Sequence, residues 1–280
     1  MDEIMVTTND TAEMMLEEVD FLSRKLLDLN KQLIESEKAK TRFLSLVANE
    51  LNNPMTALLG LIPHLSKEPN DQKQKILGMV EEEALRLDFH IQNLVAAAEI
   101  ESGEIKMSYA LINPEELIDE VLKSLKYQIL ANSITIHVDN KLQQKIVTDP
   151  QKLHLILKNL IANGCIYGND GTSVEVIIDS PSVNELTIAV KNIGKGPSVE
   201  YKPQVYTRFS HGPEGIHGLG IGLSIVRELS EKLNGNVDYE TKDRSVTFTV
   251  TLPLESKLPD SQACGSNEFL FESFDDAFEL

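Results

Sequence analysis

Two asparagines that lie four residues apart are the first residues whose types and spacing could do chemistry. Asn159 and Asn163 stand in the apolar stretch LHLILKNLIANG. In a helix this spacing places both amides on one face. Because amides are costly to bury unless they bind something, the pair predicts a ligand site. An oxygen-preferring cation such as Mg²⁺ is one candidate.

Two glycine-rich segments follow this pair along the chain. Residues 192–196 (NIGKG) come directly after an alternating apolar stretch, where glycines let the backbone approach a ligand closely. Residues 217–223 (HGLGIGL) open an expected helix, whose free N–H groups suit an anion such as phosphate. One such segment is a weak signal, but the three elements in this order are much more specific. The glycines concerned are Gly194, Gly196, Gly218, Gly220 and Gly222.

The region that must position these residues has the pattern of an α/β layer sandwich. One helix is predicted to start at Asn113-Pro114 and another at Asp149-Pro150, since a capping side chain precedes a proline in both. A third helix, residues 219–234, is predicted to end in a left-handed cap at Gly235. Alternating apolar residues predict strands over 134–139, 173–179, 185–192, 236–240 and 245–252.

The N-terminal part of the chain is predicted to be helical. Apolar residues recur at steps of three and four from about Ala12 to Val47, which favours a dimeric coiled coil over one amphipathic helix packed on its own domain. Pro54 is expected to kink this helix without ending it. A turn at 67–72 and a second helix over 73–100 complete a helical hairpin, and two such hairpins would pair into a four-helix bundle.

The order of these motifs resembles the transmitter core of a two-component sensor histidine kinase. Asn159–Asn163 resembles the N box, 192–196 the G1 box and 218–222 the G2 box of the GHKL fold that gyrase and Hsp90-type ATPases share. Residues 205–210 (VYTRFS) resemble the F box, and residues 48–60 (ANELNNPMTALLG) resemble the phosphoacceptor H box. The resemblance covers residues 40–254.

The resemblance implies an α+β protein in four parts. These are a coiled-coil signalling helix (1–40), a dimerisation hairpin (41–108), an ATP-binding α/β sandwich (109–254) and a C-terminal tail (255–280). It also implies a homodimer and ATP or ADP with Mg²⁺, the metal at Asn163. The nucleotide contacts implied are Asn159, Asn163, Tyr167, Asn192 and the five glycines above.

Three positions depart from the family's pattern. Asn49 stands where the family has its phosphoacceptor histidine, and a carboxamide is not a nucleophile at neutral pH. Asn192 replaces the G1 aspartate that accepts a hydrogen bond from the adenine amino group. Ile166 replaces a basic residue before Tyr167. We therefore expect a pseudokinase with weakened or lost nucleotide binding.

Glu50 and Asn53 match a second family motif. A Glu-x-x-Asn or Glu-x-x-Thr pair directly after the histidine dephosphorylates a partner receiver domain in this family. At this spacing Glu50 and Asn53 share a helix face. The amide is then expected to orient a water for attack on an aspartyl phosphate. The alternative is that the asparagines only open a kink before Pro54 and that Glu50 is a solvated acid.

The last 26 residues lie outside the family core. They carry seven acids and one base, and after a polar linker they end in FLFESFDDAFEL. In a helix Phe271, Phe274 and Phe278 form one apolar stripe. The stripe either folds back onto the chain or docks into a partner's groove, which the flanking acids predict to be basic.

Composition excludes several classes of partner. The 280 residues have a formal net charge of −18, which argues against nucleic acid and against an anionic membrane surface. No apolar run approaches the length of a membrane helix, and residues 1–10 do not read as a signal peptide. Cys165 and Cys264 cannot form a disulfide framework, so we expect a cytoplasmic protein.

Three functions follow from the motifs. The first is a dimeric pseudokinase that acts as a scaffold or regulator and binds a receiver domain or another histidine kinase. The second is a phosphatase of a phosphorylated response regulator, with Glu50 and Asn53 as the working pair. The third is a conformational switch driven by ATP.

Overall fold

A computed structural model describes residues 2–65, 70–142, 144–182, 184–194, 196, 205–206 and 220–254. The chain forms two compact units, residues 1–50 and residues 51–280. Helix α1 (Asp2–Leu61) contains Pro54 in its interior, so the prediction that this proline does not end the helix is confirmed. A short 3₁₀ helix, η1 (Ile62–His64), follows it.

Helix α2 (Asn70–Ser102) begins earlier than predicted. The predicted turn at 67–72 is wrong from Asn70 onward, because asparagine and aspartate are favoured in the first positions of a helix. The described helices include none that is long and apolar enough to cross a membrane.

The second unit contains a five-stranded sheet in the order β2-β4-β5-β7-β6. β2 pairs in parallel with β4, and the remaining pairs are antiparallel. The strands are β2 (Thr135–Asn140), β4 (Ser173–Ser182), β5 (Glu185–Ile193), β6 (Asn236–Lys242) and β7 (Ser245–Pro253). The sequence did not predict the two-stranded sheet of β1 (Ala110–Ile112) and β3 (Ile146–Thr148).

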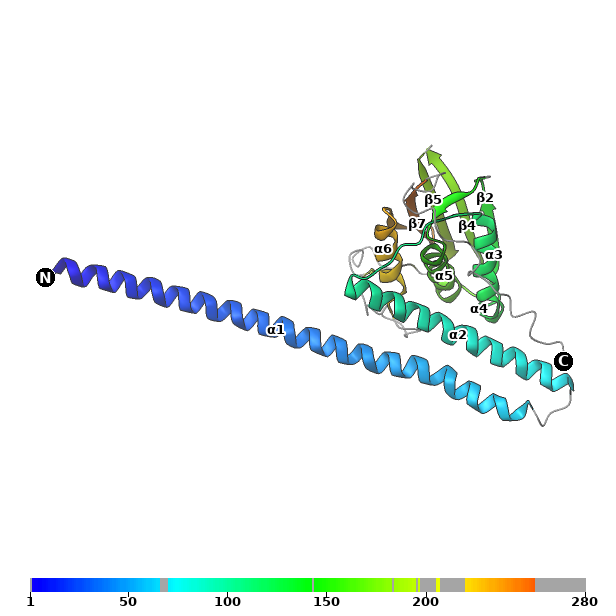
Figure 1. Cartoon of the computed structure of the whole chain (residues 1–280), viewed down its shortest axis with the longest axis horizontal. Helices are drawn as coiled ribbons and strands as arrows, with labels where there is room; N and C mark the ends of the chain where they lie inside the picture. The colour runs from blue at the N-terminus through cyan, green and yellow to red at the C-terminus, as the bar shows by residue number, and fades with distance from the viewer. Residues whose placement is uncertain are drawn as a thin grey trace. The chain divides into compact units, whose positions relative to one another are not determined.

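Helices cover one face of the large sheet (Figure 1). They are α3 (Pro114–Ser124), α4 (Lys126–Ala131), α5 (Pro150–Tyr167) and α6 (Gly222–Lys232). Every second residue of β5 and β7, and of β4 as far as Ile178, is buried, and α5 buries Ile156 and Leu160. The alternation predicted from the sequence therefore builds the core of an α/β sandwich, and the predicted fold class is confirmed.

The predicted start of α3 is confirmed, but the predicted end of α6 is partly wrong. Asn113 caps α3 by accepting a 3.1 Å hydrogen bond from the Glu115 N–H. After α6, Asn234 adopts the left-handed conformation (φ 60°), and Gly235 does not. Gly235 meets a different demand, because a Cβ there would lie 2.1 Å from the backbone oxygen of Thr251.

Candidate functional site

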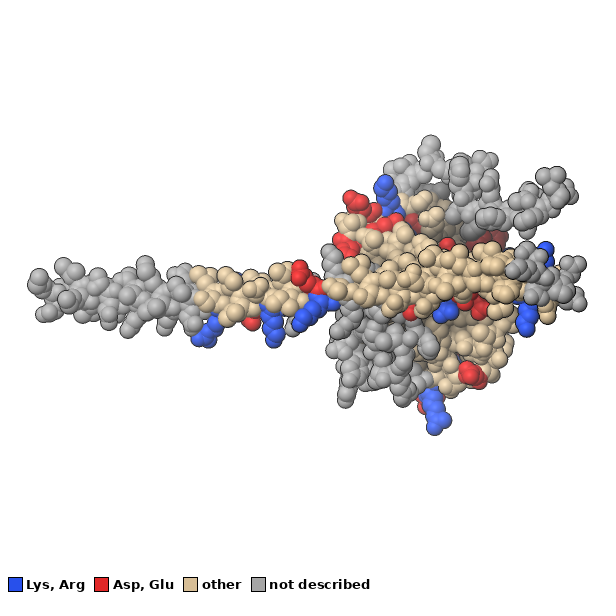
Figure 2. All heavy atoms as spheres, turned by 90° about the horizontal axis from the view of Figure 1, so that it is seen from below, with Lys and Arg blue, Asp and Glu red and all other residues tan. Residues whose placement is uncertain are grey.

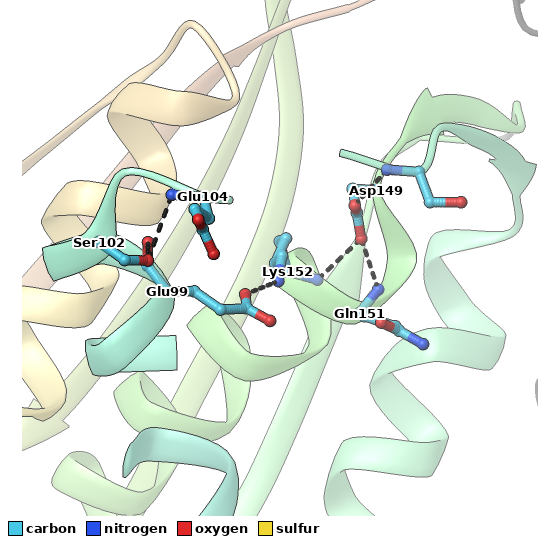
Figure 3. A network of polar contacts seen from close by, with 7 residues as sticks. Glu99, Ser102, Glu104, Asp149, Gln151 and Lys152 are labelled. Carbon is cyan, nitrogen blue, oxygen red and sulfur yellow. Dashed lines mark hydrogen bonds and ion pairs between the residues drawn. The ribbon is translucent and has the colours of Figure 1, made fainter. Parts of the chain in front are cut away.

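Helix α5 carries the asparagine pair and is fastened at its first turn. Both Asp149 oxygens are used: Oδ1 accepts from the N–H groups of Gln151 and Lys152 (3.0 Å each), and Oδ2 accepts from the Ser108 N–H (2.7 Å). Lys152 also pairs with Glu99 of α2 at 2.7 Å (Figure 3). These contacts fix the start of α5 against the end of α2 and the segment that follows α2.

Asn159 lies at a junction of three helices. Its Nδ2 donates to Asn93 Oδ1 of α2 (2.7 Å) and to the carbonyl of Leu155 (2.9 Å). A Cβ at Gly222, the first residue of α6, would lie 2.5 Å from Asn159 Oδ1. Glycine at position 222 is thus required for α6 to start against this amide. Asn159 of the N box and Gly222 of the second glycine segment therefore lie close together, and Asn159 Nδ2 donates to protein acceptors.

Lys158 is buried beside Asn159 and faces α2. Its ammonium lies 3.7 Å from Asp88 Oδ2, 3.3 Å from Gln92 Oε1 and 4.8 Å from the centre of the Phe89 ring. Burial lowers the pKa of this lysine, and the Asp88 carboxylate opposes that change. Burial, helped by the Lys158 charge, also lowers the pKa of His154 to about 4. The N-box helix therefore meets α2 through polar groups that are partly desolvated.

Asn192 ends the buried alternation of β5. Its side chain is 5 % exposed, and its Nδ2 has no hydrogen-bond partner among the described residues. Gly194 follows two residues later, where a Cβ would lie 2.1 Å from the backbone oxygen of Tyr167 and 3.1 Å from this Nδ2. The backbone of Gly194 donates to the carbonyl of Arg244 at 2.9 Å. The G1-type turn is therefore held tightly and leaves one buried donor unused.

The start of α6 offers backbone N–H groups. Gly220 adopts a left-handed conformation (φ 64°), and Ile221, at the cap position, supplies no side-chain hydrogen bond to the helix. Uncapped N–H groups at a helix start favour an anion. Together with the unused Asn192 donor, they fit a bound nucleotide.

The remaining predicted site residues lie as follows. Asn163 is half-buried and one turn beyond Asn159 in α5, while Tyr167 is exposed at the end of that helix. Gly196 is packed against Val246 and Thr241. Asn49, Glu50 and Asn53 all lie in α1, where Asn49 and Asn53 are exposed. Gly218, part of the F-box-like segment and the tail phenylalanines Phe271, Phe274 and Phe278 lie outside the described residues.

Two segments of the sequence match known families. Residues 148–256 match the histidine kinase-, DNA gyrase B- and HSP90-like ATPase family, and residues 39–103 match the His Kinase A (phospho-acceptor) domain. The chain contains the transmitter core of a two-component histidine kinase.

Curated relatives of this transmitter core are sensor kinases. Sensor histidine kinase AtsR of Burkholderia thailandensis is 28% identical over 239 residues, which are 80% of this chain and 40% of AtsR. Sensor protein EvgS of Escherichia coli K12 is 25% identical over 84% of this chain and 20% of EvgS. Sensor histidine kinase YcbM of Bacillus subtilis is 23% identical over 89% of this chain and 83% of YcbM. The chain thus spans less than half of the first two relatives.

Solved structures agree on the fold. Histidine kinase AdeS of Acinetobacter baumannii has a TM-score of 0.51 at 19% identity, over 73% of this chain and 97% of the AdeS chain. Full-length ShkA in complex with AMPPNP has a TM-score of 0.56 at 20% identity, over 76% of this chain and 46% of ShkA. The ATP-binding part of the transmitter core therefore has the GHKL-type fold that its motifs predicted.

The contacts with α2 were not predicted from the sequence. Asn93 and Asp88 lie 66 and 70 residues from the α5 side chains that they meet. One signal was present: Asn93 interrupts the apolar face of α2 in the same way that Asn159 interrupts that of α5. No cluster of three or more His, Cys, Asp or Glu side chains able to hold a metal occurs in the described part of the chain.

Proposed function

We propose that this chain is a dimeric regulator of a two-component pathway that has lost autokinase activity and acts by binding a partner. The observation that carries the proposal is Asn49, an exposed residue of α1 inside the segment that matches the phosphoacceptor domain. A neutral imidazole nitrogen can attack a phosphoryl group, whereas the amide nitrogen has its lone pair delocalised into the carbonyl. The position remains on the surface while its nucleophile is gone.

The proposed partner is a receiver domain of a response regulator, with another histidine kinase as the alternative. Histidine kinase ThkA, which shares this fold (TM-score 0.50, 21% identity), has been solved in complex with response regulator TrrA. The exposed asparagines at 49, 52 and 53 offer hydrogen-bonding groups on one stretch of α1. A receiver domain docked there would find donors and acceptors but no phosphoryl donor.

Exposed apolar side chains support the proposed homodimer. Figure 2 shows a stretch along one side of the long helix that carries few Lys, Arg, Asp or Glu side chains. Large apolar side chains are exposed along both long helices, and a second copy would cover them as in a four-helix bundle. They include Leu22, Leu26, Leu29 and Leu33 of α1 and Leu77, Met79, Ile91 and Val95 of α2.

A second function, phosphatase activity toward the same receiver domain, is favoured by the continuity of α1. Because the helix runs through Pro54, Glu50 and Asn53 keep the three-residue helical spacing that the motif needs. Asn53 is exposed, so its amide is accessible to a docked aspartyl phosphate. There it would orient a water, and no histidine would compete to take the phosphoryl group.

One experiment separates binding from phosphatase activity. Glu50→Ala/Asn53→Ala is compared with the unaltered chain for release of phosphate from a phosphorylated receiver domain and for receiver binding. Asn30→Ala, at an exposed amide of the same helix outside the proposed docking stretch, is the matched control. Slower dephosphorylation in the double variant alone supports the phosphatase. Unchanged dephosphorylation removes that function, and failure of every receiver domain and kinase of the pathway to bind removes the regulator.

A third function, nucleotide-dependent switching, is supported by the site around Asn192. ShkA, of the same fold, was solved with the ATP analogue AMPPNP. Here the α6 N–H groups would hold the phosphates, Asn163 a Mg²⁺ ion, and Asn192 the base. The phosphates of a bound nucleotide would supply the negative charge that the α6 N–H groups favour, and its base would pair with Asn192. Gly222 lies against Asn159, which is hydrogen-bonded to Asn93 of α2. A shift at the start of α6 would therefore displace Asn159 and be transmitted to α2.

A further inference from the structure

The amide of Asn192 is a buried polar group with an unused donor. Its side chain is 5 % exposed and its Nδ2 has no partner among the described residues. Most buried side-chain donors in proteins are paired, and an unpaired one is destabilising unless a ligand or water completes it. The Nδ2 of Asn192 therefore needs a hydrogen-bond acceptor that the described residues do not provide.

Two neighbours of Asn192 are glycines, which carry no side chain that could accept from its amide. A Cβ at Gly194 would approach Nδ2 to 3.1 Å, and a Cβ at Gly164 would lie 3.7 Å from the Asn192 Cβ. Both positions are crowded, because a Cβ at Gly194 would also lie 2.1 Å from the Tyr167 oxygen and a Cβ at Gly164 would lie 3.1 Å from the Val174 side chain. Glycine at these positions supplies no side-chain acceptor to the amide. The backbone around the amide is fixed, because Gly194 donates to Arg244 and the Asn169 N–H donates to the carbonyl of Ile193 at 2.8 Å.

Adenine and the 6-oxopurines differ in the hydrogen-bond donors and acceptors that they would present to an amide such as that of Asn192. Adenine carries an amino donor at C6 and an acceptor at N1, whereas hypoxanthine and guanine carry a carbonyl acceptor at C6 and a donor at N1. A carboxylate only accepts, and so favours adenine's amino group. An amide both donates and accepts, and the donor of Asn192 is the atom that is buried without a partner.

We infer that the base-binding position at Asn192 takes a 6-oxopurine nucleotide at least as tightly as an adenine nucleotide. The inference rests on the proposed nucleotide-binding function and specifies its ligand. The C6 oxygen accepts from Nδ2, and the N1–H donates to Oδ1. With the amide rotated by half a turn, adenine also finds one acceptor and one donor, so Asn192 relaxes the choice of base that an aspartate would impose.

The test compares ATP with ITP, which differ only at C6 and N1 of the base. Calorimetry with the full chain and Mg²⁺ gives both dissociation constants. We expect ITP to bind the unaltered chain as tightly as ATP or more tightly. Asn192→Asp should shift the ratio of affinities at least tenfold toward ATP, because a carboxylate accepts from the amino group and repels the C6 oxygen. The readout is binding, so it needs no turnover.

Two further variants control for charge and folding. Asn236→Asp makes the same chemical change at an exposed position at the start of β6 and should leave the ratio unchanged. Asn192→Ala removes the amide without burying a charge, and it should weaken ITP and ATP binding without restoring a preference for ATP. Thermal unfolding of each variant shows that the domain is folded.

Three outcomes of these measurements would overturn the inference. Tighter binding of ATP than of ITP by the unaltered chain overturns the inference and leaves the proposed nucleotide binding intact. A ratio that does not move in Asn192→Asp, with that variant folded, also overturns the inference. Failure of both nucleotides to bind the unaltered chain overturns the proposed nucleotide binding and the inference with it.

Discussion

The phosphoacceptor segment of α1 and the nucleotide-type site of the α/β domain hold their residues under different physical constraints. Asn49 is exposed on a helix, where the fold makes no steric demand on the side chain. Gly194 and Gly222 each face an atom at 2.5 Å or less from where a Cβ would stand. A nucleophile can therefore be lost at position 49 at little cost in stability. Close packing, by contrast, preserves the glycines of the nucleotide-type site.

Asn192 combines both situations. It is buried, so its shape is constrained, yet asparagine and aspartate have nearly the same shape. Such a position can change its hydrogen-bonding character without disturbing its neighbours. Under the proposed function and the inference above, this difference would explain how a transmitter core keeps the architecture of its nucleotide site while it loses its nucleophile and alters its choice of base.

The largest effect expected from this comparison is that of adding one methyl group at two glycines. Gly194→Ala forces a Cβ against the Tyr167 carbonyl oxygen and should lower the free energy of unfolding by about 4 kcal/mol or more. Gly60→Ala in α1 meets nothing within 4 Å, and should raise helix stability by up to about 1 kcal/mol. Urea unfolding measures both, and equal effects would contradict the comparison.

The next effect is a pH dependence centred on His154. Its folded pKa of about 4 lies below the ordinary 6.5, so the unfolded chain binds more protons between these values. Stability should therefore fall as the pH drops from 6.5 to 4, by on the order of 3 kcal/mol from this group. In His154→Leu this part of the loss should be absent in urea unfolding at several pH values. Equal losses of stability between pH 6.5 and 4 in the unaltered chain and in His154→Leu would refute this role of His154.

The smallest effect concerns the link between α2 and the N box. Asn93→Ala removes the hydrogen bond to Asn159 and should lower the free energy of unfolding by about 1–2 kcal/mol, since a buried donor loses one of its acceptors. Gln74→Ala, at an exposed amide of the same helix, is the control and should change stability little. If nucleotide binding alters hydrogen exchange in α2, Asn93→Ala should reduce that response, and an undiminished response would exclude this bond as the link.

The sequence predicted those features of the fold and the site that depend only on residues close together in the chain. The alternation in β4, β5 and β7, the caps at Asn113 and Asp149 and the order of the boxes follow from neighbouring residues alone. The three-residue strands β1 and β3 are too short to show a period. The pairing of Asp88 with Lys158, the Asn93–Asn159 bond and the lone donor of Asn192 depend on how distant segments pack, which no local pattern encodes.

The difference between a lost nucleophile and a retained nucleotide site is tested most directly by labelling with γ-phosphate. The unaltered chain and Asn49→His are each incubated with γ-labelled ATP and γ-labelled ITP, and acid-labile label on the protein is measured. We expect no label on the unaltered chain and label on Asn49→His from at least one nucleotide. Label on the unaltered chain would contradict the loss of autokinase activity, and an unlabelled Asn49→His would contradict the retention of a working nucleotide site.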